Sequence, residues 1–226
     1  MQCIVLADEL SFEQAAMSFV NPLTALGLVD LSVQYKSSAI IQTGAASQLG
    51  RMVVGICKIQ NIPLINIVRR QEQSDLLKEM GAEHILNSSE AGWLEELEIL
   101  AKKLGARVCF ECVAGEISGQ ILNVMPFKST MIVYGNLSQS NCSGISPSIL
   151  IRGSRVEGFF LSDYAAQKGA LGMLGLMSKA GKLMREKTFH STIAARIGLE
   201  DAAESIQKYN ENMTAGKYII CPNKDA

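Results

Sequence analysis

The chain has 226 residues, a length that suits one large domain or a domain and a half. Apolar residues make up 48% and charged residues 19%, which provides a substantial core and argues against disorder. The formal net charge of −1 removes the electrostatic attraction on which nucleic-acid and anionic-membrane binding usually depend.

The composition also points to a reducing intracellular compartment. No stretch reaches the roughly 18 apolar residues that a membrane span requires. The N-terminus lacks the basic region and cleavage site of a secretory signal. Most of the six cysteines lie inside apolar runs, and the C-x-x-C pair Cys109 and Cys112 falls on a predicted buried strand, where a small apolar role outweighs a metal or redox role. We expect a protein of the cytoplasm or the mitochondrial matrix.

Two helices are predicted before the first strand of the main domain. Ser11 and Gln14 have the spacing of a capping box, which predicts a helix that stops near Asn21. A second helix over residues 23–33 follows, with Pro22 in its first turn.

Strands and helices then alternate, which predicts a doubly wound α/β fold with a parallel sheet of about six strands. The expected strands cover residues 39–41, 63–68, 83–86, 107–111, 130–134 and 156–161, and the expected helices residues 51–60, 72–80, 89–103, 116–125 and 164–180. The tail differs, with a strand-like run at 187–193, a helix at 199–209 and a strand at 216–221.

The turn of small residues at 43–50 follows the first strand and opens a helix. Such a turn directs backbone N–H groups and the positive end of the helix at a pyrophosphate. The common G-x-G-x-x-G pattern is not met, because Ser47 occupies the position of the second glycine. A dinucleotide-binding βαβ unit is the favoured interpretation, and an ordinary tight turn is the alternative.

Two arginines stand where the second strand of this unit ends. An acidic residue at this place would accept hydrogen bonds from the ribose hydroxyls of NAD. Arg69 and Arg70 instead offer guanidinium groups to a 2′-phosphate, which favours NADP over NAD. The alternative is that both arginines are simply solvated.

Other strand ends carry small or aromatic residues, at 113–115, 134–137 and 159–161. Because ligands bind at the carboxyl ends of parallel strands, the first two segments could approach a cofactor and the third could cover a nicotinamide. No G-x-S-x-G nucleophile motif, metal cluster or P-loop lysine is present, and we expect His84 and His190 to be structural.

With these features in place, the chain resembles the cofactor-binding part of the medium-chain dehydrogenase/reductase superfamily. The resemblance runs over nearly the whole chain and rests on residues 12–16, 20–25, 81–86, 135 and 216–220. Within the superfamily the chain is most similar to the zinc-free quinone reductases and trans-2-enoyl-thioester reductases. The phrases at 20–22, 66–70 and 158–162 favour the enoyl reductases.

The resemblance implies a Rossmann domain that binds NADP(H). By position it implies pyrophosphate contacts at 46–49, 2′-phosphate contacts at 69–70, and nicotinamide contacts at 134–137 and 159–161. It adds Asn21 and Lys217. The implied cofactor residues are therefore Asn21, Ala46, Ser47, Gln48, Leu49, Arg69, Arg70, Tyr134, Gly135, Asn136, Leu137, Phe159, Phe160, Leu161 and Lys217. Dimers of the family often join at the sixth strand, which implies a homodimer.

One large difference separates the chain from the family pattern. Family members carry an N-terminal GroES-like catalytic domain of about a hundred residues, which this chain lacks, together with its catalytic tyrosine or zinc ligands. Residues 1–20 are then a remnant of that domain with a linking helix, residues 21–186 the NADP-binding domain, and residues 187–226 a return toward the catalytic domain.

The resemblance implies a zinc-independent reductase that passes hydride from NADPH to an enoyl thioester or a quinone. We expect the chain alone to bind NADPH and to reduce such substrates poorly, with no catalytic residue of its own. A second hypothesis is a catalytically incomplete dinucleotide-binding or regulatory module. An NAD-linked alcohol dehydrogenase is disfavoured by Arg69 and by the missing metal ligands.

Overall fold

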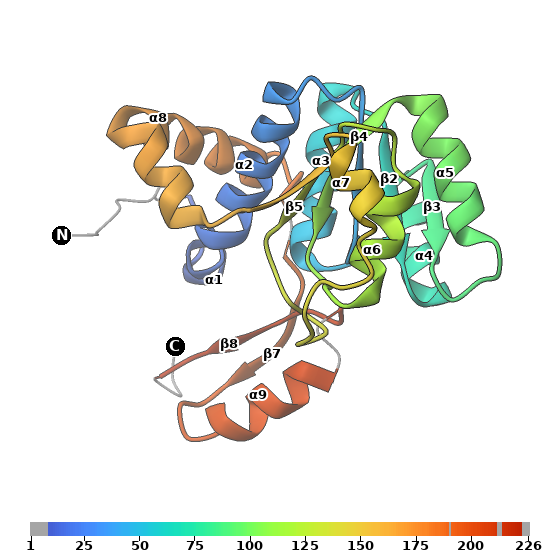
Figure 1. Cartoon of the computed structure of the whole chain (residues 1–226). Helices are drawn as coiled ribbons and strands as arrows, with labels where there is room; N and C mark the ends of the chain where they lie inside the picture. The colour runs from blue at the N-terminus through green and yellow to red at the C-terminus, as the bar shows by residue number, and fades with distance from the viewer. Residues whose placement is uncertain (1–8, 190, 212–213, 223–226) are drawn as a thin grey trace.

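A six-stranded parallel sheet forms the body of the computed structural model, which describes residues 9–189, 191–211 and 214–222. The strand order is β3-β2-β1-β4-β5-β6, with a crossover from β3 to β4 (Figure 1). The strands are β1 (Ala39–Gln42), β2 (Leu64–Val68), β3 (His84–Asn87), β4 (Ala106–Glu111), β5 (Thr130–Val133) and β6 (Arg155–Gly158). The doubly wound α/β fold expected from the sequence is confirmed.

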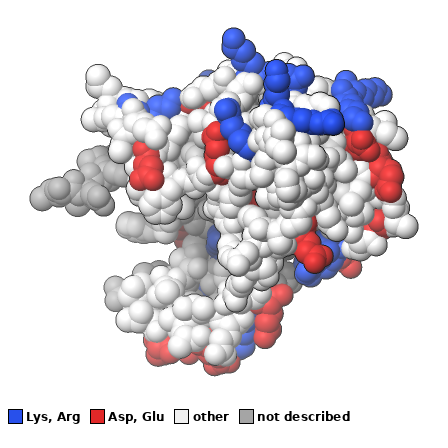
Figure 2. Space-filling model, viewed as in Figure 1, with Lys and Arg blue, Asp and Glu red and all other residues white. Residues whose placement is uncertain are grey.

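Helices cover both faces of this sheet (Figure 1). In chain order they are α1 (Phe12–Ala16), α2 (Val20–Gln34), α3 (Gln48–Gln60), α4 (Gln71–Glu79), α5 (Trp93–Leu104), α6 (Glu116–Val124), α7 (Pro147–Ile151) and α8 (Leu161–Arg185). No helix in the described ranges is long and apolar enough to cross a membrane. The face drawn in Figure 2 mixes basic and acidic side chains with wide neutral areas.

The sheet divides the interior into two apolar cores. Successive side chains of a strand point to opposite faces, so Ile40 joins one core and Ile41 the other. The core that contains Ile40 is filled from α2, α3, α4 and α8, and the other from α5 and α6. The central strands read as continuous apolar runs because they are buried on both faces.

The helix boundaries depend on caps that the apolar pattern only partly shows. The capping box of Ser11 and Gln14 is confirmed at the start of α1. The expected break near Asn21 is wrong, since α1 ends at Ala16 and α2 already begins at Val20. Helix α7, which starts at Ser146 as its N-cap, was not expected.

Two expected strands are corrected by the structure. Strand β6 ends at Gly158, so residues 159–161 are not part of it, and α8 begins at Leu161. The strand-like run expected at 187–193 is not a strand, because β7 (Ile193–Ile197) begins where that run ends. The N-terminal apolar run at 1–10 lies mostly outside the described residues.

A second, smaller unit follows α8. It consists of β7, α9 (Ala202–Glu211) and β8 (Lys217–Ile220), with β7 and β8 paired in parallel as a two-stranded sheet. This C-terminal unit lies at the lower end of the view in Figure 1, beside the main sheet. The helix and the last strand agree with the expected elements within a few residues.

One buried cluster joins α2 to α8. The Asp30 carboxylate accepts hydrogen bonds from the Tyr164 hydroxyl at 2.7 Å and from the Lys168 ammonium group at 2.5 Å. Burial by itself raises the pKa of Asp30, but the bonds from Lys168 and Tyr164 outweigh it and leave that pKa below its ordinary value. The cluster therefore stabilises the fold while Asp30 is ionised.

We expect the Asp30→Asn variant to lose stability at pH 7 and much less at low pH. A carboxyl group with a lowered pKa in the folded state contributes stability above its ordinary pKa, and this contribution disappears as the pH falls below about 4. Urea unfolding at several pH values measures the difference between the variant and wild type. A difference that does not shrink toward low pH would contradict this role, and Glu79→Gln on the exposed face of α4 is the control.

Candidate cofactor-binding site

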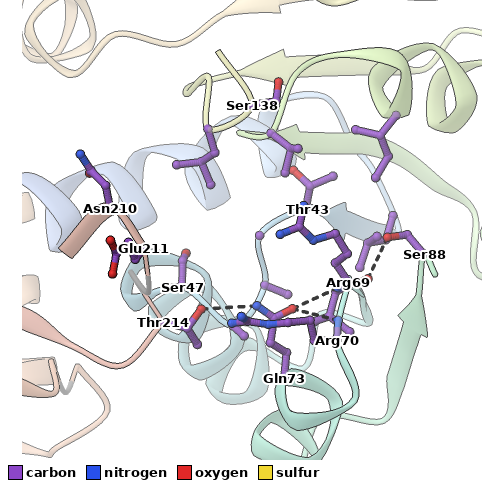
Figure 3. Close-up of a pocket in the computed structure, with 18 residues that line it drawn as sticks. Thr43, Ser47, Arg69, Arg70, Gln73, Ser88, Ser138, Asn210, Glu211 and Thr214 are labelled. Atoms are coloured by element: carbon purple, nitrogen blue, oxygen red, sulfur yellow. Dashed lines mark hydrogen bonds between the residues drawn. The ribbon is translucent and has the colours of Figure 1, made fainter. Parts of the chain in front are cut away.

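A cavity of about 320 Å³ opens at the carboxyl ends of β1, β2 and β4. The turn after β1 and the residues that follow β2 form much of its wall, and the end of α9 closes the opposite side (Figure 3). The cavity therefore lies where parallel α/β sheets bind ligands. Its polar lining residues are Thr43, Ser47, Arg69, Arg70, Gln73, Ser88, Ser138, Asn210, Glu211 and Thr214.

The turn between β1 and α3 is shaped by close backbone packing. Gly44 has a φ of +57°, which glycine adopts readily. A side chain at Gly50 would place its Cβ 2.4 Å from the Ala45 carbonyl oxygen. Ser47 is the N-cap of α3 and its hydroxyl accepts the Gly50 N–H at 3.0 Å. Together these contacts direct the first turn of α3 toward the cavity.

The helix begins three residues earlier than the apolar pattern indicates, and this changes the positions of two predicted residues. Gln48 is 3% exposed, and its side-chain oxygen accepts the Thr192 N–H at 3.1 Å. Leu49 packs against the apolar core. Neither side chain lines the cavity, so any contact of theirs with a pyrophosphate would come from backbone N–H groups.

Arg69 and Arg70 form one rim of the cavity, as the sequence predicts. Both are exposed, and Figure 3 shows them across the cavity from Asn210 and Glu211. The backbone N–H groups of Arg69 and Arg70 donate to the side-chain oxygen of Gln73, at 3.0 and 3.2 Å. The rim thus carries two positive charges on a backbone that is fixed by a side chain of α4.

Buried polar groups support the cavity wall at the end of β4. The Glu111 carboxylate accepts the N–H groups of Val113 at 2.6 Å and Ala114 at 2.7 Å, and burial raises the pKa of Glu111. The Thr43 hydroxyl accepts the Cys112 N–H at 2.9 Å. These bonds hold the turn after β4 against the turn after β1.

The C-x-x-C pair behaves as buried apolar residues, as the sequence predicts. Cys109 and Cys112 are 0% and 4% exposed, and burial raises the pKa of the Cys112 thiol to about 11. The described residues contain no group of three or more His, Cys, Asp or Glu that could hold a metal ion. Tyr134 is buried beside Cys112, and burial raises its pKa as well.

The cavity brings together only part of the predicted cofactor residues. Ala46, Ser47, Arg69, Arg70 and Leu137 line it. The other predicted residues, which lie outside its lining, are Asn21, Gln48, Leu49, Tyr134, Gly135, Asn136, Phe159, Phe160, Leu161 and Lys217. The Lys217 ammonium group donates to the Tyr209 hydroxyl at 2.6 Å, within the C-terminal unit.

The aromatic residues expected over a nicotinamide are divided between core and surface. Phe159 packs its ring 5.4 Å from that of Tyr164, centre to centre, and lies against Gly27 of α2. Phe160 is 68% exposed. Phe159 therefore belongs to the packing between α2 and α8.

A protein-family model described as zinc-binding dehydrogenase matches residues 49–179, which is more than half of the chain. The chain belongs to the zinc-binding dehydrogenase family. The comparisons also confirm the expected cofactor-binding domain of the medium-chain dehydrogenase/reductase superfamily.

Individual relatives of this zinc-binding dehydrogenase domain are reductases. The chain is 23% identical over 222 residues to the mitochondrial enoyl-[acyl-carrier-protein] reductase of Homo sapiens, and it covers 96% of itself and 60% of that protein. A crystal structure from Mesorhizobium loti, of a protein proposed to be an NADPH:quinone reductase, is 30% identical with a TM-score of 0.86 and coverages of 97% and 63%.

The Escherichia coli quinone oxidoreductase, solved with NADPH, shares the fold of the zinc-binding dehydrogenase domain. It has a TM-score of 0.83 at 22% identity, with 97% of this chain and 68% of that chain covered. The chain thus spans about three-fifths of the curated human relative.

Sequence reasoning missed five polar lining residues of this family member. Gln73 and Ser88 follow β2 and β3, and Asn210, Glu211 and Thr214 come from the end of α9 and the residues after it. Their neighbours in the sequence form no motif. A long-range contact between the C-terminal unit and the main sheet brings them to the cavity.

Proposed function

We propose that the chain is the NADPH-binding domain of a zinc-independent medium-chain reductase. The observation that carries the proposal is the pair Arg69 and Arg70 at the rim of a cavity that begins at the N-terminus of α3. The helix end suits a pyrophosphate, and the guanidinium groups suit a 2′-phosphate. A bound nicotinamide would supply the hydride, and this chain's residues would hold and orient it.

The acceptor that we propose is an enoyl thioester or a quinone. The names of the human and Mesorhizobium loti relatives support this choice. We propose residues 21–186 as the NADP-binding domain, with residues 1–20 and 187–226 belonging to a second, catalytic domain. Because no catalytic residue is proposed within the chain, it should bind NADPH without turning over such acceptors at ordinary reductase rates.

Calorimetric titration of the chain with NADPH and NADH tests the proposal. We expect NADPH to bind at least tenfold more tightly, since one additional charge-assisted hydrogen bond to a phosphate contributes about 1.5 kcal/mol or more. Equal affinities would leave a dinucleotide site without NADP selectivity. Absence of binding to both would reject the proposed function.

A regulatory dinucleotide-binding module is the second candidate. The observation that favours it is coverage, because the chain spans about 60% of the human reductase. Such a module would bind NADPH as described above. It differs in one measurable respect, since adding a separately produced GroES-like domain of a related reductase would not restore acceptor reduction.

We also propose a homodimer that forms through β6. This strand is the edge of the main sheet, and Val156 of β6 and Ile151 of α7 are 39% and 84% exposed. An open edge strand with apolar neighbours can pair with a second copy of itself. For the compartment we propose the cytoplasm or the mitochondrial matrix, which the names of the mitochondrial relatives support.

Light scattering coupled to size exclusion measures the assembly. We expect a dimer for wild type and a monomer for Val156→Lys, because the charge would be buried between two copies. Ile59→Lys, on the exposed face of α3, is the control and should stay dimeric. A wild-type monomer at micromolar concentration would contradict the dimer proposal.

A further inference from the structure

Gln73 connects three parts of the candidate site through one side chain. It is the third residue of α4, and its oxygen accepts the backbone N–H groups of both Arg69 and Arg70. Its amide nitrogen donates to the Thr214 hydroxyl at 3.4 Å (Figure 3). The side chain therefore joins the end of β2, the start of α4 and the C-terminal unit.

The two N–H groups that Gln73 accepts determine how the arginines leave the backbone. They are successive donors at the point where β2 ends, and neither belongs to the strand or to a helix. Unpaired donors at a turn leave the backbone free to choose among several conformations. One oxygen that accepts both restricts this choice, so that both arginine side chains start from the wall of the cavity.

The guanidinium groups themselves have little else to hold them. Both arginines are exposed, and among the described residues neither forms an ion pair. Long exposed side chains lose rotamer entropy when they bind a ligand. A fixed backbone reduces the disorder that must be removed when they meet a phosphate, which is the effect of preorganisation.

We propose that Gln73 is a positioning residue that sets selectivity for the 2′-phosphate, and that Thr214 extends this control to the C-terminal unit. The inference rests on the proposed function, since it assumes that Arg69 and Arg70 face a phosphorylated ribose. Gln73 acts through the arginines and does not itself contact the phosphate. Its loss should affect ligands with a 2′-phosphate and leave ligands without one unchanged.

The test compares two ligand pairs on the Gln73→Met variant, a substitution that keeps side-chain length and removes both hydrogen-bonding atoms. The pairs are NADPH with NADH, and adenosine 2′,5′-bisphosphate with adenosine 5′-phosphate. We expect the affinities for NADPH and the bisphosphate to fall about tenfold, because two hydrogen bonds of ordinary net strength no longer fix the arginines. The affinities for NADH and adenosine 5′-phosphate should stay within about twofold.

Gln71→Met is the matched control, because Gln71 lies in the same helical turn and donates to Asp75 instead. It should change none of the four affinities. An equal loss for phosphorylated and unphosphorylated ligands in Gln73→Met would show a merely structural role and overturn the inference, as would no loss at all. Wild type that binds neither NADPH nor the bisphosphate would instead reject the proposed function.

Thr214→Val keeps the inference testable if Gln73→Met does not fold. This variant removes only the acceptor of the Gln73 amide. We expect about a twofold to threefold loss for NADPH and no change for NADH, which corresponds to one weak hydrogen bond. Unchanged NADPH affinity would overturn the part of the inference that concerns the C-terminal unit.

Discussion

Replacement of Arg69 by alanine should lower the affinity for NADPH about a hundredfold and leave the affinity for NADH unchanged. A guanidinium group on a phosphate forms charge-assisted, bidentate hydrogen bonds that together contribute about 2.7 kcal/mol. NADH has no 2′-phosphate, so it does not depend on this group. Calorimetry with both cofactors gives the two affinities, and Arg70→Ala measured alongside shows how the two arginines share the contact.

Arg107 provides the control for this experiment. It is exposed on β4 near the amino end of the sheet, at the opposite end from the cavity. Arg107→Ala removes the same charge from the chain, so it reveals any effect of net charge alone. Equal losses for NADPH and NADH in Arg69→Ala would contradict the 2′-phosphate role.

Gly50→Ala should unfold or strongly destabilise the chain. The added Cβ would lie 2.4 Å from the Ala45 carbonyl oxygen and 2.7 Å from that of Gly44, and both are backbone atoms that cannot turn aside. Strain of this kind costs about 3 kcal/mol or more. Urea unfolding followed by circular dichroism measures the change. The displaced turn should also weaken NADPH binding in any folded fraction.

Gly175→Ala is the matched control. Gly175 lies in α8, and a Cβ there meets no atom within 4 Å. Alanine favours a helix over glycine by up to about 1 kcal/mol, so this variant should be as stable as wild type or more stable. If both glycine variants had wild-type stability, the tight turn between β1 and α3 would not constrain the fold.

The sheet could be predicted from the sequence because its strands are buried on both faces. Ile40, Ile41 and Ile65 are 0% exposed, and such runs of apolar residues stand out between polar turns. The end of β6 was misplaced for the same reason. Phe159 is apolar because it packs between α2 and α8, and the sequence pattern does not distinguish this from a strand position.

The candidate site could be predicted only where its parts are close in sequence. The turn after β1 and the arginines after β2 belong to one βαβ unit with a known spacing, so Ser47 and Arg69 were found. Gln73 was missed because an exposed glutamine in a helix has no distinctive pattern. Thr214 was missed because its contact with Gln73 spans 141 positions in the sequence.

The division of the interior by the sheet has a consequence for how damage accumulates in this protein. Leu97 and Leu183 occupy cores on opposite faces of the sheet, where they share no packing neighbours among the core clusters. Substitutions at distant positions without shared partners usually add in their effect on stability. Each core should therefore tolerate its own substitutions independently, and a compensating change must arise on the same side of the sheet as the loss that it repairs.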